Sequence, residues 1–164
     1  MITKTMQDAI NDQINKELYS AYLYLSMAAY FEDNNLPGFA HWMRVQESEE
    51  REHAMKLYDF LLERGGRVIL KAIDAPKTEW KSTLEVAEEV AAHEAKVTAY
   101  IYALYETALK EKDYPAQMML QWFITEQVEE EKNAAEIVAN LKLIETHGTA
   151  VLMLDSRLAK RGRE

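Results

Sequence analysis

The chain has 164 residues, of which 48% are apolar and 29% are charged, a composition typical of one globular domain with a sizeable core. The formal net charge is −9 and no basic stripe runs through the sequence, which argues against nucleic acid as a partner. The absence of cysteine excludes disulfides, thiolate zinc sites and iron–sulfur clusters. No apolar segment is long enough to span a bilayer, and no signal segment follows Met1, so we expect a cytoplasmic protein without membrane contacts.

Two long helices are predicted in the first part of the chain, at about residues 5–33 and 36–64. The polar turn Asp33-Asn34-Asn35 ends the first helix. The second begins at Leu36-Pro37, where proline is tolerated because the N–H groups of a first turn have no helical partners. Gly65-Gly66 then supplies a C-terminal glycine signal.

Residues 65–82 show no helical period and contain Pro76, so they are predicted to form a long crossover loop. A third helix, at about 83–112, opens at Ser82 and Glu85, which have the spacing of a capping box. A fourth is predicted at about 114–146, with Asp113 as its N-cap, and a short amphipathic helix at about 149–161.

The alternation of short, long and short connections predicts a four-helix bundle with one crossover. Helices of this length are roughly 40–50 Å long at 1.5 Å per residue, so the long loop must travel the length of the bundle. We therefore expect an all-α, ferritin-like bundle with a short fifth helix at its C-terminus, formed by a single domain over residues 1–164.

The core-facing stripe of each long helix is apolar except at a few positions. Every stripe carries at least one carboxylate, and counting from the helix ends places these polar residues at about the same depth in the bundle. Random placement of polar residues does not converge in this way. The residues are Glu17, Glu50 with His53, Glu94, and Glu130 with Gln127.

Four carboxylates in an apolar interior cannot stay ionised unaided, because desolvation and mutual repulsion both oppose the charged form. Two divalent cations would balance the four glutamates. Carboxylate and imidazole ligands without thiolate suit iron and manganese, and also admit zinc. Glu50 and His53 are three residues apart, so they share a helix face and can bind one metal together.

Further motifs accompany this set, and together they resemble the non-haem ferritins of bacteria and archaea over essentially the whole chain. The motifs are Asn11-Asp12-Gln13, Glu17 to Tyr24, Gly38 to Met43, Glu49-Glu50 with His53-Ala54, Glu63 to Gly66, Lys112-Asp113-Tyr114, and Trp122-Phe123 followed by Glu126 to Glu131. The resemblance implies oxidation of Fe(II) by dioxygen or peroxide, and storage of ferric mineral in a hollow shell of 24 identical subunits.

The resemblance also implies site residues. Glu17, Glu50 and His53 match a first iron position; Glu94, Glu130 and the bridging Glu50 match a second, with Gln127 close by. Glu49, Glu126 and Glu129 match a third iron position. Tyr24 and Trp122 match aromatic residues near the centre that can donate electrons. Arg51 stands where bacterioferritins carry a haem-ligating methionine, so no haem is expected.

Some alternatives remain open at this point. Gln127 has either a ligand's role or only a hydrogen-bonding one, and Glu129 lies in a charge run of the kind that usually marks a solvated face. For the whole protein, the alternatives to a ferroxidase cage are a storage shell without catalysis and a small di-iron oxidase that works as a dimer.

Overall fold

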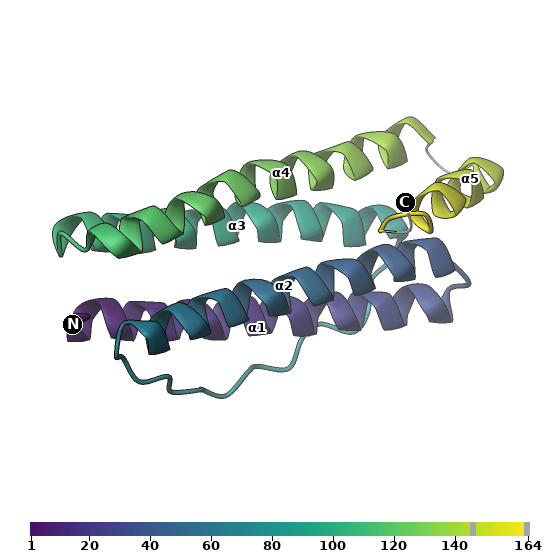
Figure 1. Ribbon diagram of the computed structural model, residues 1–164. Coiled ribbons are helices and arrows are strands. Elements are labelled where there is room, and N and C mark those ends of the chain that lie inside the picture. The colour runs from purple at the N-terminus through teal and green to yellow at the C-terminus, as the bar shows by residue number, and fades with distance from the viewer. Residues whose placement is uncertain (145–146, 163–164) are drawn as a thin grey trace.

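The computed structural model describes residues 1–144 and 147–162, and this part of the chain folds into five helices (Figure 1). Within the described residues, none of these helices combines the length and apolarity that crossing a bilayer requires. The helices are α1 (Lys4–Asp33), α2 (Pro37–Glu63), α3 (Thr83–Lys110), α4 (Tyr114–Ile144) and α5 (Gly148–Leu158).

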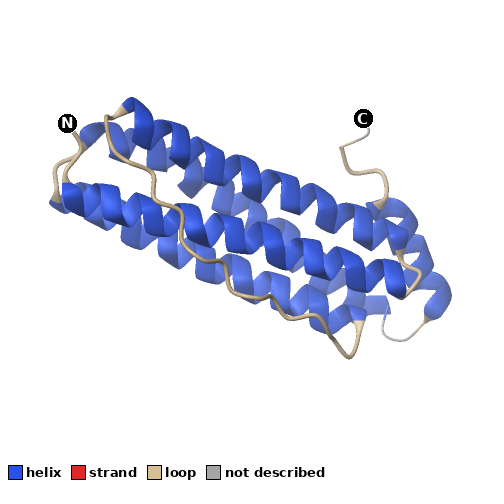
Figure 2. Ribbon diagram, turned by 90° about the horizontal axis from the view of Figure 1, so that it is seen from below, coloured by secondary structure: helices blue, strands red, loops and turns tan. Residues whose placement is uncertain are grey.

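The four long helices form the predicted bundle, with α1 packed against α2 and α3 against α4 (Figure 1). The segment between α2 and α3 runs along the length of the bundle, so the two helix pairs are joined by one crossover (Figures 1 and 2). The α5 helix packs on α2 and α4 at one end. This arrangement confirms the predicted fold class.

The helix ends differ from the predicted ones by small amounts. The α3 helix ends at Lys110 and α5 ends at Leu158, both earlier than predicted. Lys112 has a φ of 53° and the N–H of Asp113 bonds to the carbonyl of Ala108, so α3 closes in a tight left-handed turn. The predicted end of the fourth helix at residue 146 lies outside the described residues.

The glycine signal after α2 acts as predicted. Gly65 has a φ of +72°, and the N–H groups of Gly65 and Gly66 bond to the carbonyls of Leu62 and Leu61, at 2.9 Å each. These two bonds are those of a Schellman motif, which needs a residue that adopts the left-handed conformation at low cost. The chain leaves α2 here and turns back toward α1.

Hydrogen bonds from α1 hold the crossover segment against the bundle. The side chain of Asn11 accepts a bond from the N–H of Ile69 at 2.8 Å and donates one to the carbonyl of Arg67 at 3.0 Å. Farther along, the hydroxyl of Ser26 donates to the carbonyl of Lys77 at 2.7 Å. An extended segment without internal hydrogen bonds thereby satisfies part of its backbone.

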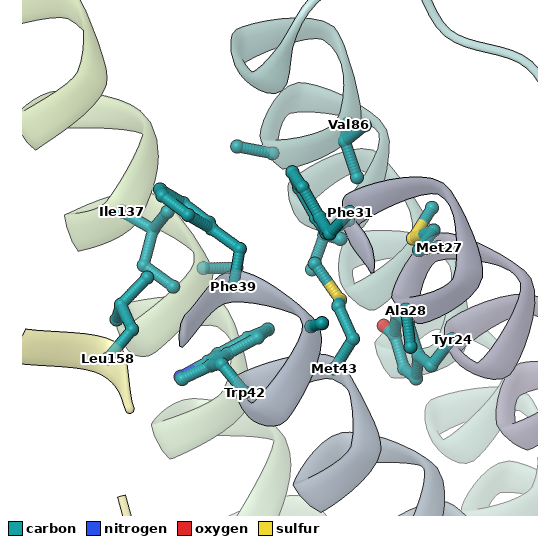
Figure 3. Close-up of a cluster of buried hydrophobic side chains, with 14 of the residues drawn as sticks. Tyr24, Met27, Ala28, Phe31, Phe39, Trp42, Met43, Val86, Ile137 and Leu158 are labelled. Carbon is teal, nitrogen blue, oxygen red and sulfur yellow. The ribbon is translucent and has the colours of Figure 1, made fainter. Parts of the chain in front are cut away.

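The apolar core divides into two clusters along the bundle. One lies toward α5 and includes Phe31, Phe39, Trp42, Ile137 and Leu158 (Figure 3), where the rings of Phe31 and Phe39 stack at 5.0 Å between centroids. The other contains residues 6–14 of α1, 57–61 of α2, 97–108 of α3 and 116–123 of α4. On each long helix, a short stretch belonging to neither cluster separates the two.

Candidate metal centre

The polar residues of the four core-facing stripes occupy the level between the two apolar clusters. All of them are almost inaccessible to solvent, with exposed fractions between 0% and 5%. Because each of the four long helices changes from one cluster to the other at this level, the polar residues meet across the bundle axis. They are Glu17, Gln46, Glu50, His53, Glu94, Gln127 and Glu130.

Glu17, Glu50 and His53 form the tightest group. Each offers one ligand atom, and these atoms all lie within 4.8 Å of one another. His53 lies three residues after Glu50 on α2, and its Nδ1 is 3.6 Å from a Glu50 oxygen. A cation placed among the three side chains would meet two carboxylates and an imidazole, a donor set that suits iron.

Glu94 is held by neighbours on two other helices. The hydroxyl of Tyr24, on α1, donates a hydrogen bond to one carboxylate oxygen of Glu94. The amide of Gln127, on α4, donates to the other oxygen at 3.2 Å, and also to the hydroxyl of Thr98 at 3.1 Å. In this structure Gln127 therefore acts as a hydrogen-bond donor that orients Glu94.

Two glutamines that the sequence argument did not assign to the site also contact it. Gln13 donates to Glu17 at 2.7 Å, and Gln46 donates to Glu130 at 2.9 Å. Gln13 precedes Glu17 by one helical turn, and that spacing is the signal in the sequence that identifies it. Gln46 lies in the α2 stripe, but its bond crosses to α4, which helical spacing does not reveal.

Burial dominates the electrostatics of the centre. Desolvation raises the pKa of Glu17 and of Glu50 well above the usual 4.5. Repulsion from Glu50 raises the pKa of Glu17 further, and repulsion from Glu94 and Glu130 raises the pKa of Glu50 further. Desolvation also raises the pKa of Glu94 to about 7, although the bonds from Tyr24 and Gln127 oppose this increase. The site therefore favours either bound protons or bound cations in place of bare carboxylates.

Several oxygens in the described centre are buried without a hydrogen-bond partner. They are Oε2 of Glu17, both carboxylate oxygens of Glu50, and Oε1 of Gln46. A buried acceptor that no donor reaches costs free energy, so an arrangement of this kind calls for a positively charged occupant. The donor set fits iron in two respects. Carboxylate and imidazole ligands suit this metal, and the buried oxygens that lack a hydrogen-bond donor are available to a cation.

The residues expected to form a third iron position lie at the edge of this centre. Glu49 and Glu126 are partly buried and line one pocket of about 380 Å³ together with His53. Glu129 is exposed on α4 and does not line that pocket. The carboxylate of Glu49 pairs with Arg161 at 2.7 Å.

The two aromatic residues expected near the centre contact different members of it. Tyr24 is fully buried, and its hydroxyl reaches Glu94 directly. Trp122 is 39% exposed and packs edge-on against His53, with 5.4 Å between the ring centroids. Lys56 lies over the face of Trp122 at 4.2 Å. Both rings are thus within contact distance of a predicted ligand.

Comparisons with known proteins point to one family. A family model described as the ferritin-like domain matches residues 7–144. The chain is 43% identical over 161 residues to a bacterial non-heme ferritin of Bacteroides fragilis, which covers 98% of this chain and 100% of that protein. A bacterial non-heme ferritin of Staphylococcus saprophyticus is 40% identical over the same length, covering 98% of this chain and 96% of that protein.

Among solved structures, the chain is similar to an open-pore ferritin from the hyperthermophilic archaeon Archaeoglobus fulgidus. The TM-score is 0.97 and the sequence identity 52%, over 98% of this chain and 99% of that one. A structure described as a humanized archaeal ferritin is 51% identical, with a TM-score of 0.97, and covers 98% of both chains.

Proposed function

This chain belongs to the ferritin family of iron-storage proteins, and on that premise we propose that it oxidises Fe(II) at the buried centre and stores the ferric product inside a shell of 24 identical subunits. In this proposal Glu17, Glu50 and His53 bind the first iron. Glu50, Glu94 and Glu130 bind the second, so that Glu50 bridges the pair.

The chemistry follows from the charge of the centre. Two Fe(II) ions balance four carboxylates, so binding relieves the desolvation and repulsion that raise the pKa of Glu17, Glu50 and Glu94. Two adjacent ferrous ions together supply the two electrons that, with two protons from solvent, convert dioxygen to hydrogen peroxide, or hydrogen peroxide to two molecules of water. Each iron loses one electron, and the ferric ions then leave as the mineral product.

The environment of the two carboxylate oxygens of Glu50 is the observation that supports the proposal most strongly. Both are buried, both lack a hydrogen-bond donor, and the carboxylate lies beside a ligand-like group from another helix. A purely structural glutamate in a bundle core would be paired or hydrogen-bonded. A bridging carboxylate needs both of its oxygens free for metal.

Rapid mixing of the metal-free protein with Fe(II) and dioxygen tests this assignment. We expect the E50A and H53A variants to oxidise iron no faster than buffer, while their circular dichroism stays that of the parent. E131A, at an exposed position on α4, is the matched control and should keep the parental rate.

The same measurement separates the alternatives. A parental rate in E50A or H53A would show that the site is assigned wrongly. A parent protein that oxidises iron no faster than buffer would leave only a storage shell without catalysis.

A further inference from the structure

The C-terminal turn after α5 is attached to α2 at three residues. Arg161 places its guanidinium 2.7 Å from the carboxylate of Glu49 and over the ring of Trp42, at 4.6 Å from the centroid. The backbone carbonyl of Arg161 accepts a hydrogen bond from Nε2 of His41 at 2.9 Å. Trp42 and Glu49 are seven residues apart, so they lie on one face of α2.

This contact involves Glu49, a carboxylate that the sequence resemblance assigns to a third iron position. Glu49 lines the pocket of about 380 Å³ that also contains His53 and Glu126. Burial raises the pKa of Glu49, and the carboxylates of Glu130 and Glu126 add to the increase, whereas the charge of Arg161 opposes it. Arg161 is thus a cation already paired with one of the ligands expected at the third position.

We propose that Arg161 is a positioning residue that competes with metal for Glu49 and so sets the affinity of the third iron position. The inference rests on the proposed function and on the third iron position expected from the sequence, with Glu49 and Glu126 among its ligands. Metal at Glu49 displaces the guanidinium, and the C-terminal turn loses one of its three attachments to α2.

Competition is the expected outcome for physical reasons. An Arg–carboxylate pair that is partly screened from water, with exposed fractions of 21% and 36%, is held by a charge-assisted hydrogen bond. A cation that takes the same oxygen must first break this bond, so part of its binding free energy is lost. By linkage, metal at Glu49 weakens the attachment of the turn by the same factor.

Substitution of Arg161 tests the proposal, and Arg157 provides the matched control. R161Q removes one positive charge and the pair with Glu49. R157Q removes the same charge from the same segment, but Arg157 pairs with Glu136 at 3.3 Å, and both of these side chains are more than half exposed. R161K keeps the charge and is the conservative variant.

The readout is the binding of redox-inert Zn²⁺ to the assembled, metal-free protein, measured by calorimetry and located by anomalous scattering from soaked crystals. We expect R161Q to bind Zn²⁺ at Glu49 and Glu126 about three- to tenfold more tightly than the parent. R157Q should match the parent, R161K should stay near it, and metal binding at Glu17, Glu50 and His53 should be unchanged in all.

Unchanged or weaker Zn²⁺ binding at Glu49 in R161Q would overturn the inference while leaving the proposed function intact. Absence of metal at Glu17, Glu50 and His53 in the parent would instead contradict the proposed function itself. Hydrogen exchange provides an independent readout: saturating Zn²⁺ should speed exchange in the peptide containing residues 159–162, and E49Q should abolish this response. Exchange in the parent that does not respond to Zn²⁺ would also overturn the inference.

Discussion

Glu50 is the side chain with the least compensation for its burial. It is 1% exposed, neither of its oxygens receives a hydrogen bond, and Glu94 and Glu130 repel its charge. Glu94, by contrast, is supported by Tyr24 and Gln127. A buried carboxylate without hydrogen-bond donors should lower the stability of the metal-free protein at any pH at which it ionises.

The stability of the metal-free protein should therefore fall as the pH rises. Below about pH 4.5, Glu17, Glu50 and Glu94 are protonated in both the folded and the unfolded chain, so their raised pKa has no effect on stability. Above it the unfolded chain ionises while the folded chain retains its protons, up to about pH 7 for Glu94. The unfolded state gains free energy of ionisation that the folded state lacks, so the melting temperature decreases across this window.

The E50Q variant should show a smaller decrease in melting temperature with rising pH than the parent. At pH 7.5, with a chelator present, we expect a melting temperature roughly 2–8 °C above that of the parent, and no difference at pH 4.5. E131Q is the control at an exposed position. Added metal should restore the parent at high pH and have little effect on E50Q. A difference between E50Q and parent that stayed the same at both pH values would contradict this explanation.

For individual residues, the sequence predicted which side chains meet but not all of the contacts that hold them. The periodic stripes bring Glu17, Glu50, His53, Glu94 and Glu130 to one level, and the structure places them there. Their role as ligands stays a prediction. Helical spacing gives no information on contacts between separate elements, which is why the bonds of Gln46 to Glu130 and of Arg161 to Glu49 were missed.

At the scale of elements, the junction of α2 and α5 depends on a close approach. Leu36 gives α2 no side-chain cap, and the carboxylate of Asp155 in α5 accepts the N–H of Phe39 at 2.9 Å instead. A Cβ at Gly38 would lie 1.8 Å from the carbonyl oxygen of Asp155. The buried carboxylate of Asp155 at the N-terminus of α2, and the absence of a side chain at Gly38, together allow α5 to pack closely against α2.

Substitutions at this junction should detach α5 and leave the bundle folded. D155A removes the cap of α2 and should lower stability by about 1–2 kcal/mol. G38A should be worse, because backbone atoms must move apart to admit the methyl group. Hydrogen exchange should increase in residues 148–158 in both variants and stay parental in α1 and α3. G148A, where a Cβ meets nothing within 4 Å, is the control.

The sequence was informative about the helices themselves and less so about their capping and docking. Asp113 caps α4 as predicted, accepting the N–H of Ala116 at 3.1 Å. Ser82 accepts the N–H of Glu85, but the Glu85 side chain bonds to the N–H of Lys81 and not to that of Ser82. The docking of α5 through Asp155 was not predicted, because no local pattern links residue 155 to residue 39.

In the whole molecule, one face of α5 is buried against the bundle and another is exposed. Leu154 and Leu158 are buried against the bundle, whereas Leu152 and Met153 are 57% and 71% exposed. These two line a pocket of about 410 Å³ together with Thr149 and Ser156. Apolar side chains that a lone subunit leaves exposed on a docked helix are typical of contacts between subunits.

Assembly is expected to depend on this face of α5. We expect the parent protein to form a large particle by light scattering, and L152E to shift it toward smaller species, because a charge is costly in an apolar contact. Q121E, which adds the same charge to an exposed position on α4, is the control.

The dissociated L152E protein should still oxidise a first pair of Fe(II) ions, since its proposed ligands all come from one chain. It should fail to retain mineral, since retention needs an enclosed cavity. A parent species of about 38 kDa, twice the 19.0 kDa chain, would contradict the shell and favour a dimeric oxidase.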